Sequence, residues 1–292
     1  MAGSLKVGFI GLGQMGLPLY RRVAAKFPSS CWALHPPRTS DHDFKMATGA
    51  SEAVREANVI VTCLPNSDVV RQIYNDIQHA LIKDSVWIDC TSGDPSISKS
   101  LSEHSVSNSR HFLDCAVSGG PLGAQKGHLT TMVGGDVQAF DQCKVILETF
   151  ARKIVYIGPS GTGHAVKAIN NALLAIGIWS AAEGLLALKK LGVSPSRALE
   201  AINSSSGRSW ATMQRYPDHV IPRTFDYGFS LDLLKKDLAT ACRILKEADV
   251  PARMMGEQLS LVEQAIEYTG PTADHLEMIK LLEKWSQACI EE

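Results

Sequence analysis

The amino-acid sequence predicts an α/β half built on a doubly wound, mostly parallel sheet, followed by an all-helical half. Three observations carry this prediction. Short apolar runs alternate with helical patterns in the first half, a glycine-rich loop directly follows the first run, and the strand pattern stops after Gly163. We expect one domain over residues 1–160 and a second over residues 161–292.

The first half contains apolar runs that we interpret as strands. They cover residues 5–13, 31–35, 58–65, 85–92, 111–119, 129–135 and 153–158, and the segment 14–27 predicts the first helix. The runs lack a clean polar–apolar alternation, as expected for strands that helices cover on both faces. Strands and helices at this spacing predict right-handed crossovers and a mostly parallel sheet.

The second half shows only helical patterns. A long helix is expected over 163–190, because lysines occupy its last turn and Gly192 follows it. Pro195 opens the next helix, as proline does at a first helical position. Further helices fit residues 231–248, 252–268 and 272–290.

Composition is typical of a soluble protein with ordinary partners. The chain has 292 residues, 45% of them hydrophobic, and a formal net charge of -1, so no basic surplus indicates nucleic acid. Seven cysteines without a CxxC pair indicate a reducing compartment, no disulfide framework and no metal site. We see no run of about 20 apolar residues and no leader peptide, so we expect a cytoplasmic protein without a membrane span.

A dinucleotide fingerprint, GLGQMG, follows the first predicted strand and opens a helix. Its residues are Gly11, Leu12, Gly13, Gln14, Met15 and Gly16. The first glycines allow a tight turn and the close approach of a pyrophosphate, and the helix N-terminus attracts the phosphate charge. In this position the motif predicts a Rossmann-type domain that binds NAD or NADP.

The end of the second predicted strand favours NADP. Proteins that bind NAD place an acid there, which bonds the ribose hydroxyl. Here His35 occupies that position, and Arg38 with Thr39 and Ser40 could hold a 2′-phosphate. Alternatively, Arg38 is a solvated loop residue.

Two later strand ends should border the cofactor, because ligands of open α/β sheets bind at the carboxyl ends of strands. Leu64 and Pro65 could wall the cofactor cleft, and Thr91 or Ser92 could bond its ribose or amide groups. The same residues also fit turn and helix-cap chemistry, since the following DPS resembles a helix start.

Four blocks in order identify a resemblance to the β-hydroxyacid dehydrogenase family. They are GLGQMG, DCAVSGGPLGAQKGHLTTMVGG, GTGHAVKAINN and LLKKDLATA, and they span residues 7 to 241. Within that family, INSSSGRSW (202–210) is most similar to 3-hydroxyisobutyrate dehydrogenase. The resemblance implies a cofactor-binding N-terminal domain and a helical domain that completes the substrate site.

The resemblance implies that Lys167 is the general acid/base. Lys167 and Asn171 are i and i+4 and so share one helix face, with Asn170 beside them. Partial burial disfavours a charged ammonium, which lets a lysine exchange a proton with a substrate hydroxyl. Asn171 would bond the hydroxyl or the lysine. The alternative is a lysine that extends into solvent.

The remaining family positions concern substrate and cofactor. Ser118, Gly119 and Gly120 follow the fifth predicted strand, and the family grips the substrate carboxylate there. Lys236 in KKDL would reach the cofactor near the nicotinamide; alternatively, Lys236 and Asp237 are a solvated pair on an amphipathic helix. Arg208 could pair with the carboxylate or hold its loop, and Phe229 could line the pocket or belong to the core.

The resulting prediction is an oxidoreductase that interconverts a short 3-hydroxy acid and its semialdehyde with NAD(P), NADP being favoured. Close alternatives are a glyoxylate, succinic or tartronate semialdehyde reductase. An imine reductase is less favoured, because that group typically replaces the lysine at the position of Lys167. A protein of another class, a non-enzymatic dinucleotide sensor or scaffold, would retain the fold without turnover. The family tends to pair through its helical halves, so we expect a homo-dimer or tetramer.

Overall fold

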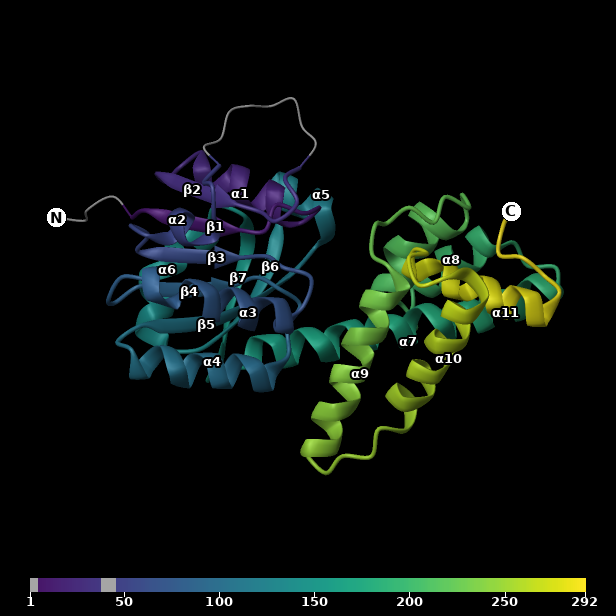
Figure 1. The fold of residues 1–292 in the computed structure, drawn as a ribbon. Coiled ribbons are helices and arrows are strands. Elements are labelled where there is room, and N and C mark those ends of the chain that lie inside the picture. The colour runs from purple at the N-terminus through teal and green to yellow at the C-terminus, as the bar shows by residue number, and fades with distance from the viewer. Residues whose placement is uncertain (1–4, 38–45) are drawn as a thin grey trace. The chain divides into compact units, whose positions relative to one another are not determined.

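A computed structural model describes residues 5–37 and 46–292 (Figure 1). Its contacts divide the chain into two compact units, Met1–Lys167 and Ala168–Glu292. Each unit has its own hydrophobic core, and each is described by itself.

The first unit is built on a seven-stranded sheet with the order β2-β1-β3-β4-β5-β6-β7. Neighbouring strands are parallel except β5 and β6, which are antiparallel. Because the chain goes from β2 back past β1 to β3, the strand order reverses between β1 and β3, where doubly wound folds bind their ligands. The predicted fold class is confirmed. The strands are β1 (Val7–Ile10), β2 (Ser29–Trp32), β3 (Val59–Thr62), β4 (Val86–Asp89), β5 (His111–Ser118), β6 (Leu129–Gly134) and β7 (Ala151–Gly158).

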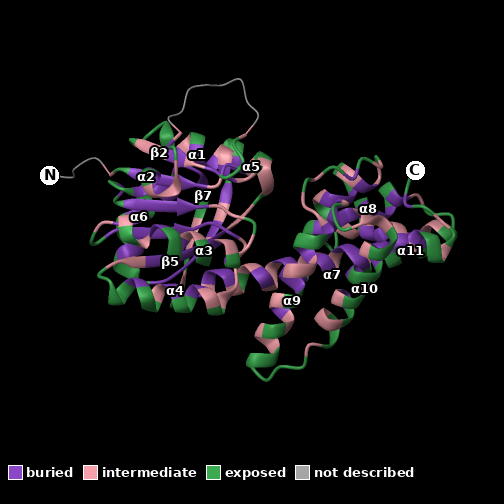
Figure 2. Ribbon diagram, viewed as in Figure 1, coloured by how far each residue is buried: buried purple, intermediate pink, exposed green. Residues whose placement is uncertain are grey.

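Helices pack on both faces of this sheet (Figures 1 and 2). One core joins the sheet to α1 (Gly16–Ala24), α5 (Gly120–Lys126) and α6 (Val137–Leu147). The other joins it to α2 (Ala50–Val54), α3 (Ser67–Ile77) with the short η1 (Gln78–Ala80), and α4 (Pro95–Ser107). Successive strand residues alternate between the cores: Phe9 faces the first and Ile10 the second. Both faces are apolar, and this explains why the strands show no alternation in hydropathy.

The second strand lies earlier than predicted. It runs over Ser29–Trp32 rather than residues 31–35, because it pairs with all four residues of β1, from Val7 opposite Ser29 to Ile10 opposite Trp32. Leu34 is already 73% exposed. Pro36 and Pro37 then lack the N–H groups that would extend the ladder.

The second unit is helical. Its long first helix, α7 (Thr162–Lys190), starts within the last residues of the first unit. Five of its small and aliphatic side chains share one buried face, at a spacing of three to four residues: Ala172, Ala175, Ile178, Ala182 and Leu185. The remaining elements are α8 (Pro195–Asn203), the π-helix η2 (Ala211–Val220), α9 (Leu231–Glu247), α10 (Arg253–Thr269), the 3-10 helix η3 (His275–Met278) and α11 (Ile279–Ser286).

The predicted single helix over 272–290 is wrong. Asp274 caps the short η3 in a capping box with Glu277, and its carboxylate also accepts the Gly228 N–H. α11 then ends at Ser286, because Gln287 adopts a left-handed conformation with φ of 51°. The π-helix η2, which contains Pro217, was not predicted from the sequence.

The expectation that no segment is long and apolar enough to span a membrane is also wrong. α7 passes that test by length and composition, with a mean hydropathy of 1.5 over its most apolar window. The core helix of a soluble protein passes the same test. We interpret α7 in this way, since its buried face packs into the core of the second unit.

Candidate active site

The glycine loop after β1 is shaped by contacts of the protein itself at two positions. Gly11 has a φ of 100°, and a Cβ there would lie 2.3 Å from the Cys63 carbonyl oxygen. A Cβ on Gly16 would lie 1.9 Å from the Gly11 carbonyl oxygen. Only glycine therefore lets the loop close between β1, β3 and the start of α1.

Gly13 differs from these two glycines, because a Cβ there would meet no atom of the described residues within 4 Å. The protein's own packing does not require this glycine, so its open side can admit a ligand close to the backbone. The first turn of α1 carries no acidic side chain, and this leaves the positive end of the helix dipole unopposed. Leu12 is buried beneath the loop, whereas Gly13 and Gln14 are exposed and Met15 is half-buried. These features fit a dinucleotide pyrophosphate.

The segment after β2 contains no acid over the described residues 33–37. His35 is exposed there. Arg38, with Thr39 and Ser40, lies outside the described residues. The structure therefore tests neither the cofactor preference nor the role of the arginine.

The next two strand ends are tied together by Thr91. This residue is buried, its hydroxyl accepts the Leu64 N–H at 3.1 Å, and its own N–H donates to Asp89 Oδ1 at 3.1 Å. Turn chemistry thus accounts for Thr91, and the predicted helix start is also present, since Asp94 caps α4. Leu64 and Ser92 are half-buried and Pro65 is exposed, so these side chains remain candidate cofactor contacts.

The predicted carboxylate loop forms the junction between β5 and α5. Ser118 is the last residue of β5, and the next two residues have positive φ angles, 132° at Gly119 and 66° at Gly120. Both glycines are therefore needed for the turn. Ser118 and Gly120 are half-buried and Gly119 is exposed, so the loop can be reached from solvent.

Asp114, on the same strand, holds the beginning of α7. Its side chain is fully buried; Oδ1 accepts the Gly161 N–H at 2.6 Å and Oδ2 accepts the His164 N–H at 2.9 Å. A Cβ on Gly163 would lie 2.4 Å from the Met132 carbonyl oxygen and 2.6 Å from that of Asp114. The helix therefore docks closely on β5 and β6. Both carboxylate oxygens satisfy N–H groups that a helix start leaves unpaired.

This anchor connects two predicted site elements. Strand β5 carries Asp114 and ends at Ser118, while α7 carries His164 and, one turn later, Lys167. Asp114 thus fixes the helix with the proposed acid/base on the strand with the proposed carboxylate loop. This role of Asp114 was not predicted from the sequence, although an acid inside an otherwise apolar strand was a signal for it.

His164 is a second buried group that the sequence analysis missed. Its Nδ1 lies 2.8 Å from Ser98 Oγ of α4, and its Nε2 lies 4.0 Å from Asp89 Oδ2. A Cβ on Gly93 would lie 2.4 Å from the imidazole ring. The ring therefore packs the start of α7 against the end of β4 and the start of α4.

Within the second unit, Asn171 belongs to a polar network that links α7 and α9. Asn171 is 5% exposed, and its Nδ2 donates to Asp237 Oδ2 at 2.6 Å. Asn170 Nδ2 donates to Asn171 Oδ1 at 3.1 Å, and Lys236 Nζ lies 3.4 Å from Asp237 Oδ1. Asp237 is buried, so the alternative of a solvated Lys236–Asp237 pair is wrong for the acid.

Lys167 is half-buried on α7, one turn before Asn171. Helix geometry places the two side chains on one face. The network fixes the orientation of the Asn171 amide, which keeps a second N–H for another partner. Of the two further candidates, Arg208 is exposed, and Phe229 is half-buried with its ring centroid 5.4 Å from that of His275.

Comparisons with known proteins identify the family of the chain. The model of the NAD-binding domain of 6-phosphogluconate dehydrogenase matches residues 6–158, more than half of the chain. The NAD-binding domain of NADP-dependent 3-hydroxyisobutyrate dehydrogenase matches residues 161–282. The chain belongs to the β-hydroxyacid dehydrogenase family. As a β-hydroxyacid dehydrogenase it is an NAD(P)-dependent oxidoreductase, and the predicted family and enzyme class are confirmed.

Several relatives match more than four fifths of this chain. The mitochondrial 3-hydroxyisobutyrate dehydrogenase of Mus musculus is 34% identical over 82% of this chain and 76% of its own. The 2-(hydroxymethyl)glutarate dehydrogenase of Eubacterium barkeri is 30% identical over 90% of both chains. A solved structure of 3-hydroxyisobutyrate dehydrogenase from Mycobacterium tuberculosis with L-serine has a TM-score of 0.89 at 28% identity, covering 96% of this chain and 99% of that one.

Proposed function

We propose that the protein interconverts a short 3-hydroxy acid and its semialdehyde, with Lys167 as the general acid/base. The observation that carries the proposal is the face of α7 on which Lys167 and Asn171 lie one turn apart, with the Asn171 amide held by Asp237. A positioned amine beside a positioned amide is what proton transfer to or from a substrate hydroxyl requires.

In the oxidative direction the neutral amine of Lys167 takes the proton of the substrate hydroxyl, and in reduction the ammonium returns it. A bound nicotinamide supplies the hydride acceptor or donor. The second N–H of Asn171 can donate to the substrate oxygen, since its first N–H is occupied by Asp237. The position of Lys167 one turn before Asn171 supports this role, because helix geometry places both side chains on one face.

We propose that the loop of Ser118, Gly119 and Gly120 holds the substrate carboxylate. Two observations support this proposal: the loop directly follows β5, and both glycines have positive φ angles. Such a backbone conformation can orient N–H groups that donate hydrogen bonds to a carboxylate. A short acid is favoured because the acid group and the reacting carbon would then be held by two elements that Asp114 fixes to each other.

For the cofactor we propose a preference for NADP over NAD. The support is the absence of an acid over the described residues after β2, together with Arg38 in the sequence that follows. Arg38→Ala should lower the ratio of kcat/KM for NADP to that for NAD by at least about tenfold, the usual effect of losing one charged hydrogen-bonded contact. Arg55→Ala, at an exposed arginine elsewhere in the first unit, serves as the control. An unchanged ratio would contradict the assignment.

The test of the function is steady-state turnover followed at the nicotinamide absorbance. The panel includes 3-hydroxyisobutyrate, serine, 4-hydroxybutyrate, glycerate and 2-(hydroxymethyl)glutarate, each with NAD and NADP, and the semialdehydes in reverse. We expect one short 3-hydroxy acid to be turned over selectively. Cofactor binding without turnover of any compound would favour the sensor.

Replacing the proposed acid/base tests the mechanism. Lys167→Ala should lower kcat by about 100-fold to 10,000-fold, the range for a general acid/base, and leave the cofactor Kd unchanged. Lys190→Ala, at the far end of the same helix, is the matched control and should retain turnover. Near-normal kcat in Lys167→Ala would exclude the acid/base role.

A further inference from the structure

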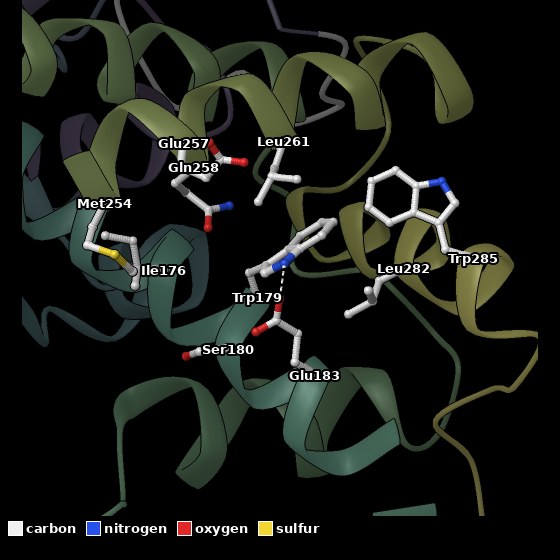
Figure 3. A pocket seen from close by; sticks show the side chains of 10 residues that line it. All are labelled: Ile176, Trp179, Ser180, Glu183, Met254, Glu257, Gln258, Leu261, Leu282 and Trp285. Carbon is white, nitrogen blue, oxygen red and sulfur yellow. Dashed lines mark hydrogen bonds between the residues drawn. The ribbon is translucent and has the colours of Figure 1, made fainter. Parts of the chain in front are cut away.

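A pocket of about 350 Å³ lies among α7, α10 and α11 of the second unit (Figure 3). Its volume lies within the range of small-molecule sites. Its lining starts at Ile176 of α7 and includes none of the residues proposed for catalysis. Trp179, central to the lining, is eight residues beyond Asn171, which corresponds to about 12 Å along the helix.

Two indole rings form the aromatic part of the pocket. Trp179 of α7 is 5% exposed, whereas Trp285 of α11 is 52% exposed, and their centroids are 6.0 Å apart in an edge-to-face arrangement. The exposed Met254 of α10 adds a flexible thioether on another side (Figure 3). Indole is the aromatic group that attracts cations best, and thioethers adapt to irregular ligands.

The charged groups of the lining are all acidic. Glu183 and Glu257 contribute carboxylates, and no lysine, arginine or histidine of the described chain lines the pocket. Glu183 Oε1 accepts the Trp179 indole N–H at 2.9 Å, so its carboxylate is held beside the ring (Figure 3). Among residues 5–37 and 46–292, neither carboxylate has a basic partner at salt-bridge distance. The local charge therefore favours a cation.

Gln258 provides a polar group at the inner wall. It is 4% exposed, and its amide extends from α10 into the pocket towards Trp179 (Figure 3). Its only hydrogen bond within the described chain runs from Nε2 to the sulfur of Met278 at 3.8 Å, and sulfur is a weak acceptor. Within the described chain no group donates a hydrogen bond to the Gln258 amide oxygen, so this oxygen can accept from an N–H donor in the pocket.

We propose that this pocket binds a small organic cation with an apolar body, such as an aryl-alkyl ammonium. The indoles and Met254 pack on the body, Glu183 and Glu257 supply opposite charge, and the Gln258 oxygen accepts from the ammonium. The site is independent of the proposed catalytic residues.

Calorimetric titration of the whole protein with three probes of similar size tests the proposal. They are phenethylammonium, its neutral analogue 2-phenylethanol and the anion phenylacetate. We expect a dissociation constant of about 1 mM for the cation, as for a good fragment. The alcohol should bind at least about tenfold more weakly, and the anion should not bind. Glu183→Gln with Glu257→Gln should abolish the preference for the cation, while Glu267→Gln, an exposed acid of α10 outside the lining, should retain it.

Three results would overturn the proposal. Equal affinity for cation and alcohol would make the site merely apolar, and an absence of saturable binding would leave no site. Sedimentation could also show that the chains associate. If Trp285→Leu then separates them, and the cation binds only to the separated chains, the pocket is an interface between copies. Turnover of the two-glutamate variant should equal that of the wild type, so a failure of the proposed enzyme activity would not affect this test.

Discussion

At the scale of single residues, Asp114 shows how a buried charge can be useful. An isolated carboxylate is expensive to bury, but each oxygen of Asp114 accepts one backbone N–H of the α7 start. The positive end of the helix adds favourable electrostatics. The charge is therefore compensated at the place where the helix of Lys167 meets β5.

Asp114→Asn should destabilise the protein by about 2–3 kcal/mol and lower kcat without weakening cofactor binding. An amide keeps one acceptor oxygen and turns an NH₂ group towards a backbone N–H, which leaves that N–H unsatisfied. Urea unfolding and steady-state kinetics measure the two effects.

The matched control is Asp136→Asn at the start of α6. Asp136 uses a single oxygen as N-cap, accepting the Ala139 N–H at 2.8 Å, and asparagine caps helices equally well. This variant should change stability by only a few tenths of a kcal/mol. Similar losses in both variants would contradict the two-oxygen account.

Sequence reasoning predicted the local part of the site and missed the long-range part. The glycine loop is readable because Gly11, Gly13 and Gly16 are close in sequence and follow a strand. The hydrogen bonds from the Gly161 and His164 N–H groups to Asp114 join residues that are 47 and 50 positions apart in the sequence. No local sequence pattern predicts such bonds. Likewise, the amphipathic pattern of α9 is compatible with a solvated Asp237. The burial of Asp237 depends on the packing of α7 against α9, which the sequence pattern does not show.

At the scale of secondary-structure elements, α7 contains glycines with opposite requirements. Gly163 has backbone oxygens of β5 and β6 closer than a Cβ can approach, whereas a Cβ on Gly184 would meet no atom of the described residues within 4 Å. Gly163 therefore allows α7 to pack closely on the sheet, whereas no neighbouring atom of the described chain requires a glycine at position 184.

We therefore expect Gly163→Ala to destabilise the protein by about 1–3 kcal/mol through overpacking, because backbone cannot move aside. Gly184→Ala should stabilise it by about 0.5–1 kcal/mol, the gain of alanine over glycine inside a helix. Thermal or urea unfolding of both variants checks the contrast. If both substitutions changed the free energy of unfolding in the same direction, α7 would not dock on β5 and β6 as described.

Element boundaries were predicted well where a local signal exists. Pro195 begins α8, and Lys189, Lys190 and Gly192 mark the end of α7, as expected, while the structure adds Ser194 as the N-cap of α8. The break within 272–290 was missed because it depends on Asp274, whose carboxylate also serves the distant Gly228. The π-helix containing Pro217 was missed because proline argues against a regular helix.

At the scale of the whole molecule, we expect the free energy of unfolding to fall at low pH because of a buried histidine in the second unit. His275 is fully buried between the rings of Tyr227 and Phe229. Its Nδ1 is 3.0 Å from Asp274 Oδ1, without the alignment of a hydrogen bond. Burial lowers the pKa of His275 below its ordinary 6.5, and the nearby Arg215 acts in the same direction, while Asp274 opposes the shift.

Because the pKa is lower in the folded protein, the unfolded chain takes up the proton first as the pH falls. The stabilisation is complete above pH 6.5 and is lost progressively below it. His275→Phe should flatten the fall in unfolding free energy below that pH by up to about 1.4 kcal/mol per pH unit. His79→Gln, at an exposed histidine, should not change the slope. An unaltered slope in His275→Phe would contradict the assignment.

The continuity of α7 across the contact boundary limits how the molecule can be recombined. The first unit ends at Lys167 and the second begins at Ala168, within the second turn of one uninterrupted helix. A hybrid of two related proteins joined at that boundary would take Lys167 from one parent and Asn170 and Asn171 from the other. The first turns of its α7 would then not have evolved together with the rest of the helix. Productive hybrids should therefore join beyond Lys190, so that the whole helix descends from one ancestor together with the strand on which it rests.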